Sequence, residues 1–186
     1  MTIYLISAAI GAVLVLGIVL AVNKTLSFMA QSPDDYTNEG TPFDIRDALN
    51  GHMICEGVIY GPTGRVSARF VADMHANWNG DEGYMTEEFR YDSGTKLDRE
   101  WTLRVVDGKR IEATAPDIIG TGEGAQEGSG VQLKYAIKLP ESSGGHVLNT
   151  TDWMYLMENG TIMNRSQMRK FGIKVAELVA TIRKAA

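Results

Sequence analysis

The chain has 186 residues, a formal net charge of −5 at pH 7 and a pI near 5.2. It contains no basic run and no basic stripe with interleaved aromatic residues, so no nucleic acid is expected as a partner. The single cysteine, Cys55, excludes an internal disulfide and any metal site that needs several cysteines.

Residues 3–22 are the most distinctive segment of the sequence. They read IYLISAAIGAVLVLGIVLAV and contain no charged side chain. As a helix this run is roughly 30 Å long, the thickness of the hydrocarbon core of a bilayer. We therefore expect residues 1–24 to form a single transmembrane anchor. A cleaved signal peptide is the alternative, but no Lys or Arg precedes the run, which also exceeds the usual apolar core of about 7–15 residues.

A polar segment, residues 25–42, separates this anchor from a predicted domain at 43–186. Its composition, with Ser32-Pro33-Asp34-Asp35 and Asn38-Glu39-Gly40, is typical of a linker. After Phe43, apolar and polar residues alternate as in half-buried antiparallel strands. In the clearest case, 65–77, the apolar residues on one face are Val66, Ala68, Phe70, Ala72, Met74 and Ala76.

Turn sequences separate these runs at short intervals and define about eight to ten strands. Among them are Gly61-Pro62-Thr63-Gly64, Asn79-Gly80-Asp81, Asp92-Ser93-Gly94 and Asp107-Gly108. The pattern predicts an all-β fold, an antiparallel sandwich or closed barrel. The last segment, 171–183, fits a strand or a short helix equally well.

The glycine-rich stretch 117–130 contains Gly120-x-Gly122-x-x-Ala125, which fits a relaxed dinucleotide-binding motif. The alternating run that starts at Val131 follows it, where a phosphate site would need a helix N-terminus. We therefore expect two strand ends joined by a tight turn. Glycines that face a barrel interior would leave room there for something else.

The hairpin around Asp92-Ser93-Gly94 gives the most informative register. A three-residue loop with Gly at its third position would set Glu87 opposite Arg99 and Met85 opposite Trp101. Both charges then lie on an apolar face, where burying either one alone would cost several kcal/mol, so we expect them to pair. Two interpretations stay open: a polar anchor for a ligand, or a structural ion pair without a ligand.

A second candidate region is the apolar strand 147–157, which contains Asp152-Trp153. One of these two side chains must point inward, and alternation does not say which. Arg165 and Lys170 are candidate partners for Asp152. No metal site is predicted, because His52 and Cys55 fall on opposite faces of a strand. No catalytic motif is evident either, so we expect neither an enzyme nor a cofactor.

Several short motifs resemble those of an uncharacterised proteobacterial envelope family called domain of unknown function 3833. They are Glu87-x-Phe89-x-Tyr91-Asp92-x-Gly94, Arg99-x-Trp101, Asp117-x-x-Gly120, Asp152-Trp153-Met154-Tyr155-Leu156, Asn164-Arg165 and Lys170-Phe171-Gly172. The resemblance covers about Phe43 to the C-terminus. It implies a lipocalin-like β-barrel and an extracytoplasmic position. The chain departs from typical members by offering a helix where they carry a lipid-modified cysteine.

These observations favour a membrane-tethered, lipocalin-like binding protein for a small hydrophobic or lipid ligand. We expect a single-pass protein that contacts the inner membrane through residues 3–22, with its soluble domain in the periplasm. The candidate ligand-binding residues are Glu87, Arg99, Trp101, Tyr91, Asp152, Trp153 and Arg165. The alternative is an accessory or structural subunit of an inner-membrane protein complex, with a filled barrel.

Overall fold

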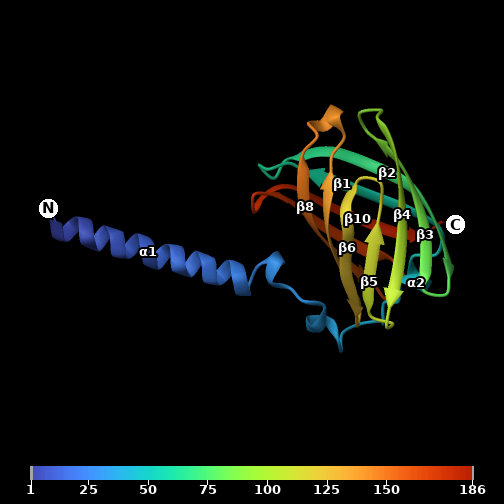
Figure 1. Cartoon of the computed structure of the whole chain (residues 1–186), viewed down its shortest axis with the longest axis horizontal. Coiled ribbons are helices and arrows are strands. Elements are labelled where there is room, and N and C mark those ends of the chain that lie inside the picture. Colours follow the sequence, from blue (N-terminus) through green and yellow to red (C-terminus); the bar gives the residue numbers. More distant parts are fainter. Residues whose placement is uncertain (1, 186) are drawn as a thin grey trace.

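The computed structural model describes residues 2–185, with side chains for all of these except residues 2, 3, 5, 8, 23, 24 and 142. Its main body is a closed antiparallel barrel of ten strands, in which each strand pairs with its neighbours in sequence and β1 pairs with β10 (Figure 1). The strands are β1 (Gly51–Tyr60), β2 (Val66–Asn79), β3 (Glu82–Tyr91), β4 (Lys96–Val106), β5 (Arg110–Thr114), β6 (Ile118–Glu127), β7 (Gly130–Lys138), β8 (Val147–Leu156), β9 (Ile162–Lys170) and β10 (Ile173–Lys184). A 3-10 turn, η3 (Glu141–Ser143), lies between β7 and β8.

The alternation in the sequence gives the sheet one apolar face, and this face forms the core of the closed barrel. In β2 the apolar residues Phe70, Ala72, Met74 and Ala76 are all buried inside the barrel. Closure pairs every strand on both sides and leaves no sheet edge. The predicted antiparallel barrel is thus confirmed, and the ambiguous segment 171–183 lies almost wholly in strand β10.

The β3–β4 hairpin has the predicted register. The N–H of Tyr91 donates to the carbonyl of Thr95 at 2.9 Å, and Gly94 has a φ of +85°, a conformation that favours glycine. Glu87 lies opposite Arg99, and Met85 lies opposite Trp101. The turn chemistry therefore fixes which side chains of both strands enter the barrel.

The glycine-rich stretch is the β6–β7 hairpin, as expected, and no helix follows it. Gly122 and Gly124 lie opposite the buried residues Ala113 and Ile111, on the inner face of the sheet. A Cβ at Gly124 would come within 2.7 Å of Leu133 Cδ2, and one at Gly122 within 3.0 Å of Tyr135 Cβ. The expectation that these glycines leave free room is therefore wrong, because side chains of β7 fill the space.

One end of the barrel is covered by a short helix, α2 (Ile45–Ala48). The side chain of Asp44 caps it by accepting a hydrogen bond from the N–H of Arg46 at 2.9 Å. Ile45 and Leu49 are almost fully buried, and the indole Nε1 of Trp78 donates to the carbonyl of Leu49 at 2.7 Å. These contacts close this end of the core.

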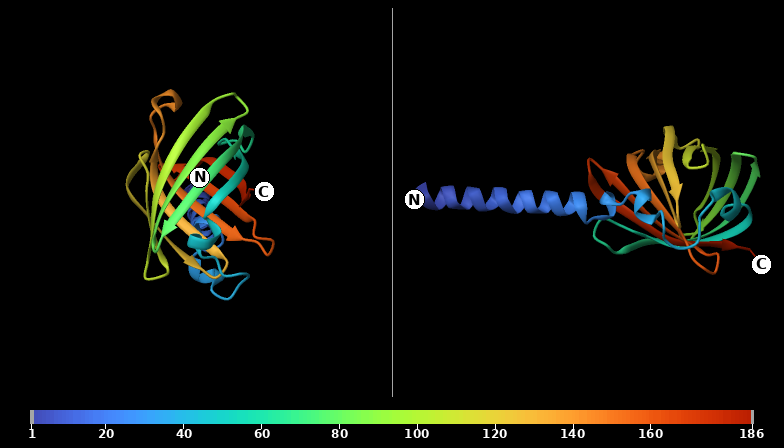
Figure 2. Two further views of the ribbon diagram at one scale, coloured as in Figure 1. Left: turned by 90° about the vertical axis from the view of Figure 1, so that its right-hand side faces the viewer. Right: turned by 90° about the horizontal axis from the view of Figure 1, so that it is seen from below.

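The N-terminal helix α1 (Thr2–Thr25) projects away from the barrel (Figures 1 and 2). The large apolar side chains described between Tyr4 and Val22 are between 46% and 81% exposed. The helix predicted for residues 3–22 is therefore present, but its transmembrane role is not supported. Within the described part of the chain, no helix offers an apolar run long enough to cross a membrane.

The predicted linker packs against the barrel instead of hanging free. It forms two 3-10 turns, η1 (Phe28–Ala30) and η2 (Pro33–Tyr36). The ring of Tyr36 lies edge-on to Trp153 and Tyr155, with centroids 5.3 and 5.4 Å away. Gln31 accepts a hydrogen bond from the hydroxyl of Tyr155 at 2.8 Å. This segment therefore covers part of the outer surface of the barrel.

Candidate functional site

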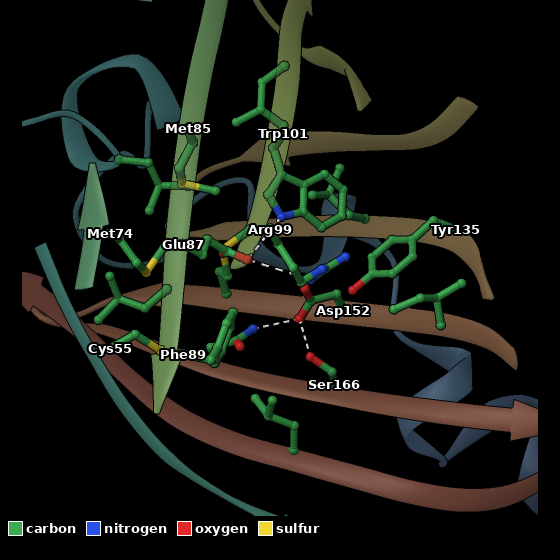
Figure 3. A pocket seen from close by; sticks show the side chains of 18 of the residues that line it. Cys55, Met74, Met85, Glu87, Phe89, Arg99, Trp101, Tyr135, Asp152 and Ser166 are labelled. Carbon is green, nitrogen blue, oxygen red and sulfur yellow. Dashed lines mark hydrogen bonds and ion pairs between the residues drawn. The ribbon is translucent and has the colours of Figure 1, made fainter. Parts of the chain in front are cut away.

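The interior of the barrel holds a cavity of about 120 Å³. Most of its wall is apolar, and four methionines, Met74, Met85, Met154 and Met168, contribute to it. Ionisable side chains in the same wall, among them Glu87, Arg99, Asp152 and Tyr135, make it amphipathic (Figure 3). An apolar wall with a few placed polar groups is typical of a small-molecule site.

Glu87 and Arg99 meet inside the barrel, as the hairpin register predicted. Nη1 of Arg99 lies 3.5 Å from Oε2 of Glu87, and the two side chains are 14% and 10% exposed. The indole Nε1 of Trp101 donates to the same carboxyl oxygen at 3.1 Å. Oε1 of Glu87 has no hydrogen-bond donor among the described residues, so this carboxyl group keeps one acceptor atom free.

Asp117, which precedes β6, makes more contacts with Arg99 than Glu87 does. Its carboxylate accepts from Nε of Arg99 at 2.8 Å and from Nη2 at 3.1 Å, which is a bidentate pair. The guanidinium also lies 4.6 Å from the ring centroid of Trp101. The one interior guanidinium is therefore already held by two carboxyl groups and an aromatic face.

Asp152 is the inward-facing member of the Asp152-Trp153 pair. Its Oδ1 accepts hydrogen bonds from Nδ2 of Asn164 and from Oγ of Ser166, both at 2.5 Å. Asn164 and Ser166 are two residues apart in β9, so they lie on the same inner face. No cationic side chain pairs with Asp152 among the described residues, and its Oδ2 accepts no hydrogen bond there.

The expected partners of Asp152 lie elsewhere. Arg165 is on the outer face of β9, where its Nη2 contacts Oε1 of Glu177 at 2.6 Å. Nζ of Lys170 lies 3.0 Å from Nδ1 of His146. Both were candidate complements of Asp152, and neither contacts it. Arg165 points outward, whereas Lys170 is in phase with Asn164 and Ser166 but lies at the end of β9, beside His146.

Burial dominates the electrostatics of the cavity. It raises the pKa of Glu87 against the lowering effect of Arg99 and Trp101, and it raises the pKa of Asp152 against its hydrogen bonds from Ser166 and Asn164. For Arg99, burial on its own would lower the pKa, but Glu87 and Asp117 outweigh it and raise that pKa. The interior therefore favours a firmly charged guanidinium beside carboxyl groups that hold protons more readily than usual.

The same burial acts on the two other titratable groups of the wall. It raises the pKa of the Cys55 thiol to about 12, with smaller effects from Glu87 and Asp152. It also raises the pKa of the Tyr135 phenol. Neither group has a hydrogen-bond partner among the described residues. A thiol with so high a pKa is a poor nucleophile at neutral pH, which argues against a role for Cys55 in covalent chemistry.

Four of the seven predicted ligand-binding residues line the cavity: Glu87, Arg99, Trp101 and Asp152. Tyr91 lies beside Phe70 and Phe89, with ring centroids 6.1 Å from each, and is not part of the lining. Trp153 is fully buried on the opposite side of the sheet, beneath Tyr36. Arg165 shares that outer side. Sequence reasoning thus found the residues of the inner cluster but also included two residues, Trp153 and Arg165, that lie on the outer face of the barrel.

Several lining residues were missed. They are Cys55, Tyr135, Asn164 and Ser166, and Asp117 was missed as the main partner of Arg99. The alternation of β7 gave a usable signal for Tyr135, which falls in phase with Leu133 and Ile137. Nothing in the local pattern distinguishes Asp117. Within the described residues, no group of three or more His, Cys, Asp or Glu is placed to hold a metal ion.

Comparisons with known proteins agree with this fold. The model of the family described as "Protein of unknown function (DUF3833)" matches residues 22–184, which confirms the resemblance found in the motifs. No curated protein matches the chain. Two solved structures resemble it at identities that show the fold alone. The S-type phycobiliprotein lyase CPES from Guillardia theta matches with a TM-score of 0.57 and 9% identity over 76% of this chain and 91% of that one. Rv2717c from M. tuberculosis matches with a TM-score of 0.54 and 18% identity over 75% and 94%.

Proposed function

Since the chain belongs to the DUF3833 family, whose description assigns no activity, we propose a function from the site itself. We propose that the protein is a lipocalin-like carrier that binds a small hydrophobic or lipid ligand in the bacterial envelope. The observation that carries this proposal is the cavity of about 120 Å³ with a polar cluster in an apolar wall. A barrel built only for stability has no need of buried charges, because apolar side chains of similar volume are often as stable or more so.

The size of the cavity limits what it can hold. An apolar cavity of about 150 Å³ in another protein binds benzene, so about 120 Å³ suits a short alkyl chain or a similarly small group. The four methionines in the wall are flexible and adapt readily to different shapes. The proposed ligand is therefore either a small molecule or one end of a larger lipid.

Co-purification tests this proposal directly. The 186-residue chain would be purified under native conditions, extracted with organic solvent and analysed by mass spectrometry for bound small molecules. Cys55→Phe would fill part of the cavity, whereas Cys55→Ser would keep its volume. We expect a ligand to accompany the native chain and Cys55→Ser but not Cys55→Phe. Equal recovery from a folded Cys55→Phe variant would contradict binding inside the barrel.

We also propose that the barrel is attached to the inner membrane through residues 3–22 and lies in the periplasm. The uncharged sequence of this run and the exposed apolar side chains of α1 support attachment. Membrane fractionation of the native chain and of a chain lacking residues 1–24 would test it. Recovery of both in the same soluble fraction would contradict the proposal.

A second candidate function is an accessory subunit of an inner-membrane protein complex. The observation that favours it is again α1, because its described large apolar side chains are exposed and would be free to pack on partner helices. Exchange of residues 1–24 for an unrelated anchor separates the two functions. A carrier would keep its ligand after the exchange, whereas a subunit would lose its partner.

A further inference from the structure

We propose that the ligand presents a protonated amine to Asp152 and Glu87, and that the cavity discriminates against carboxylates, including the head group of a fatty acid. This inference rests on the proposed carrier function and specifies the polar end of its ligand. The geometry of the cavity points to it through three features: the state of Arg99, the surroundings of Asp152, and the balance of charge.

Arg99 already has two carboxyl groups beside it, which offset its attraction for a further acid. Its Nε and Nη2 each donate a hydrogen bond to the carboxylate of Asp117, at 2.8 and 3.1 Å. Its Nη1 lies 3.5 Å from Oε2 of Glu87. The stacked indole of Trp101 lies 4.6 Å from it. A ligand carboxylate at Arg99 would bring a third negative charge next to the carboxyl groups of Asp117 and Glu87, with one guanidinium to compensate all three.

Asp152 is in a different condition, because it has hydrogen bonds but no ion-pair partner among the described residues. Its Oδ1 is held by the neutral groups of Asn164 and Ser166, which fix its orientation. Its Oδ2 and the Oε1 of Glu87 accept no hydrogen bond from the described residues. An ammonium group has three N–H donors and no acceptor, which matches these free oxygens.

The cavity wall also holds two polar groups that are not carboxyl groups and have no hydrogen-bond partner among the described residues. The thiol of Cys55, a residue only 6% exposed, lines the cavity without a hydrogen-bond partner among the described residues. The hydroxyl of Tyr135 points toward Asp152 and likewise has no partner there (Figure 3). Both groups face the cavity and are open to a hydrogen bond with a guest.

The balance of charge gives the sign of that guest. Glu87 and Asp152 line the cavity, Asp117 approaches Arg99 from outside the lining, and Arg99 is the one guanidinium among the described lining residues. Burial raises the pKa of Glu87 and of Asp152, so a proton on either carboxyl group is held more readily than in water. A ligand ammonium would take the place of such a proton, so binding should release a proton to solvent.

This exchange predicts a pH dependence. Affinity for an amine should increase as the pH rises through the raised pKa values of Asp152 and Glu87, because fewer protons then compete. It should fall only when the amine itself loses its proton, near pH 10 for an alkylamine. The described residues that line the cavity include no Lys or His. The one cation of this lining, Arg99, keeps its charge over this pH range, so no basic side chain of the lining changes its charge there.

A matched set of small ligands tests the proposal. The probes are n-butylamine, n-butanol and butyrate, which share a short alkyl chain and differ in the charge of one end. The 186-residue chain would be labelled with ¹³C at its methionine methyl groups and titrated with each probe. Met74, Met85, Met154 and Met168 line the cavity, whereas Met29 and Met157 are exposed and report non-specific effects.

We expect the four cavity methyl signals to shift with n-butylamine at a Kd about 10-fold to 100-fold below that for butyrate, with n-butanol between them. Asp152→Asn should remove most of this preference, and Glu87→Gln should reduce it. Asp73→Asn is the matched control, since Asp73 is on the outer face and bonded to Arg90. This variant should keep the full preference.

The outcomes separate this inference from the function on which it rests. Binding of butyrate as tight as that of n-butylamine would overturn the amine proposal and leave the carrier function intact. Shifts by none of the three probes would overturn small-ligand binding in this cavity. The methyl spectrum itself shows whether each variant is folded, and Glu87→Gln serves as the second test if Asp152→Asn fails to fold.

Discussion

The two faces of the wall formed by β8, β9 and β10 differ in how they compensate a carboxyl group. On the inner face, Asp152 is bound by neutral donors and burial raises its pKa. On the outer face, burial alone would raise the pKa of Glu177, but hydrogen bonds from Lys174, Arg165 and Gln167 outweigh it and lower this pKa to about 2. Glu177 on the outer face is thus bonded by two cationic side chains and an amide, whereas Asp152 on the inner face is bonded by neutral groups alone.

This contrast separates structural charge from charge that is available to a ligand. Outside, the ion pair of Glu177 and Arg165 lies beneath the N-terminal segment, with the guanidinium 4.9 Å from the ring centroid of Phe28. Inside, the free oxygens of Asp152 and Glu87 face a cavity. Charged residues of the same sheet therefore serve different purposes, because alternation sends side chains to one face or the other.

The largest expected effect tests the inner face through Arg99. Replacing it in Arg99→Leu leaves Glu87 and Asp117 without their cation, and breaking a buried pair in this way costs about 3–5 kcal/mol. Urea unfolding at pH 7 would measure the loss. Arg104→Leu is the control on the same strand, because Arg104 is outward and lies 3.8 Å from Glu112 in an exposed pair.

For Arg104→Leu we expect a loss below about 1 kcal/mol. Because carboxyl groups become neutral in acid, the difference between the two variants should shrink as the pH is lowered. Equal losses for both variants would contradict the assignment of Arg99 to a buried cluster.

The second prediction concerns the cover of the outer face. Tyr36→Ala removes the ring that packs on Trp153 and should lower the free energy of unfolding by about 1.5–3 kcal/mol. Acrylamide should then quench tryptophan fluorescence more strongly, because Trp153 becomes accessible. The control is Tyr84→Ala, a residue 46% exposed, with an expected change within about 0.5 kcal/mol.

If the two faces are independent, Tyr36→Ala should leave the binding of n-butylamine unchanged. A changed affinity would instead show that the N-terminal segment communicates with the cavity through the wall. That result would break the separation of the two faces while leaving the packing of Tyr36 on Trp153 in place.

The inner face was largely predictable, because its register follows from local chemistry. Gly94 must adopt a positive φ, so the hairpin loop has a defined length, and the pairing of Glu87 with Arg99 follows from it. Long-range contacts were not predictable in this way. Asp117 reaches Arg99 from outside the hairpin, and no local pattern indicates that approach.

The outer face was hidden for a related reason. Trp153 is fully buried although it points away from the barrel, because a segment more than a hundred residues earlier covers it. The composition of that segment is polar, which suggested a free linker. The turn between β9 and β10 was also missed. It places Phe171 at a φ of +52° before Gly172 at +79°, and an aromatic residue is rare in that conformation.

The third prediction tests the outer carboxyl group through Glu177→Gln. Because the pKa of Glu177 is lowered to about 2, its charge stabilises the fold above the pKa of the unfolded chain, near 4.3. We expect a loss of about 1–2 kcal/mol at pH 7, a range reduced because Arg165 is half exposed. The loss should disappear as the pH falls toward 2. A loss that is independent of pH would indicate packing instead of charge.

The last prediction tests Asp152, for which we expect the substitution to raise the free energy of unfolding, whereas Glu177→Gln lowers it. Its raised pKa means that the folded protein holds a proton which the unfolded chain releases, so stability falls as the pH rises from about 4 toward that pKa. Asp152→Asn keeps an oxygen for Asn164 and Ser166 and has no charge to bury. We expect it to be more stable than the native chain by about 1 kcal/mol at pH 8 and similar to it at pH 4.

The outer-face control for this effect is Asp73→Asn. Hydrogen bonds from Arg90 and His52 lower the pKa of Asp73, so this substitution should reduce stability at neutral pH and have no effect in acid. Urea unfolding at both pH values measures both variants. If Asp152→Asn instead loses stability at pH 8, the carboxylate is already compensated in the empty cavity. An amine would then gain nothing by entering, and the contrast between the two faces would no longer indicate a ligand.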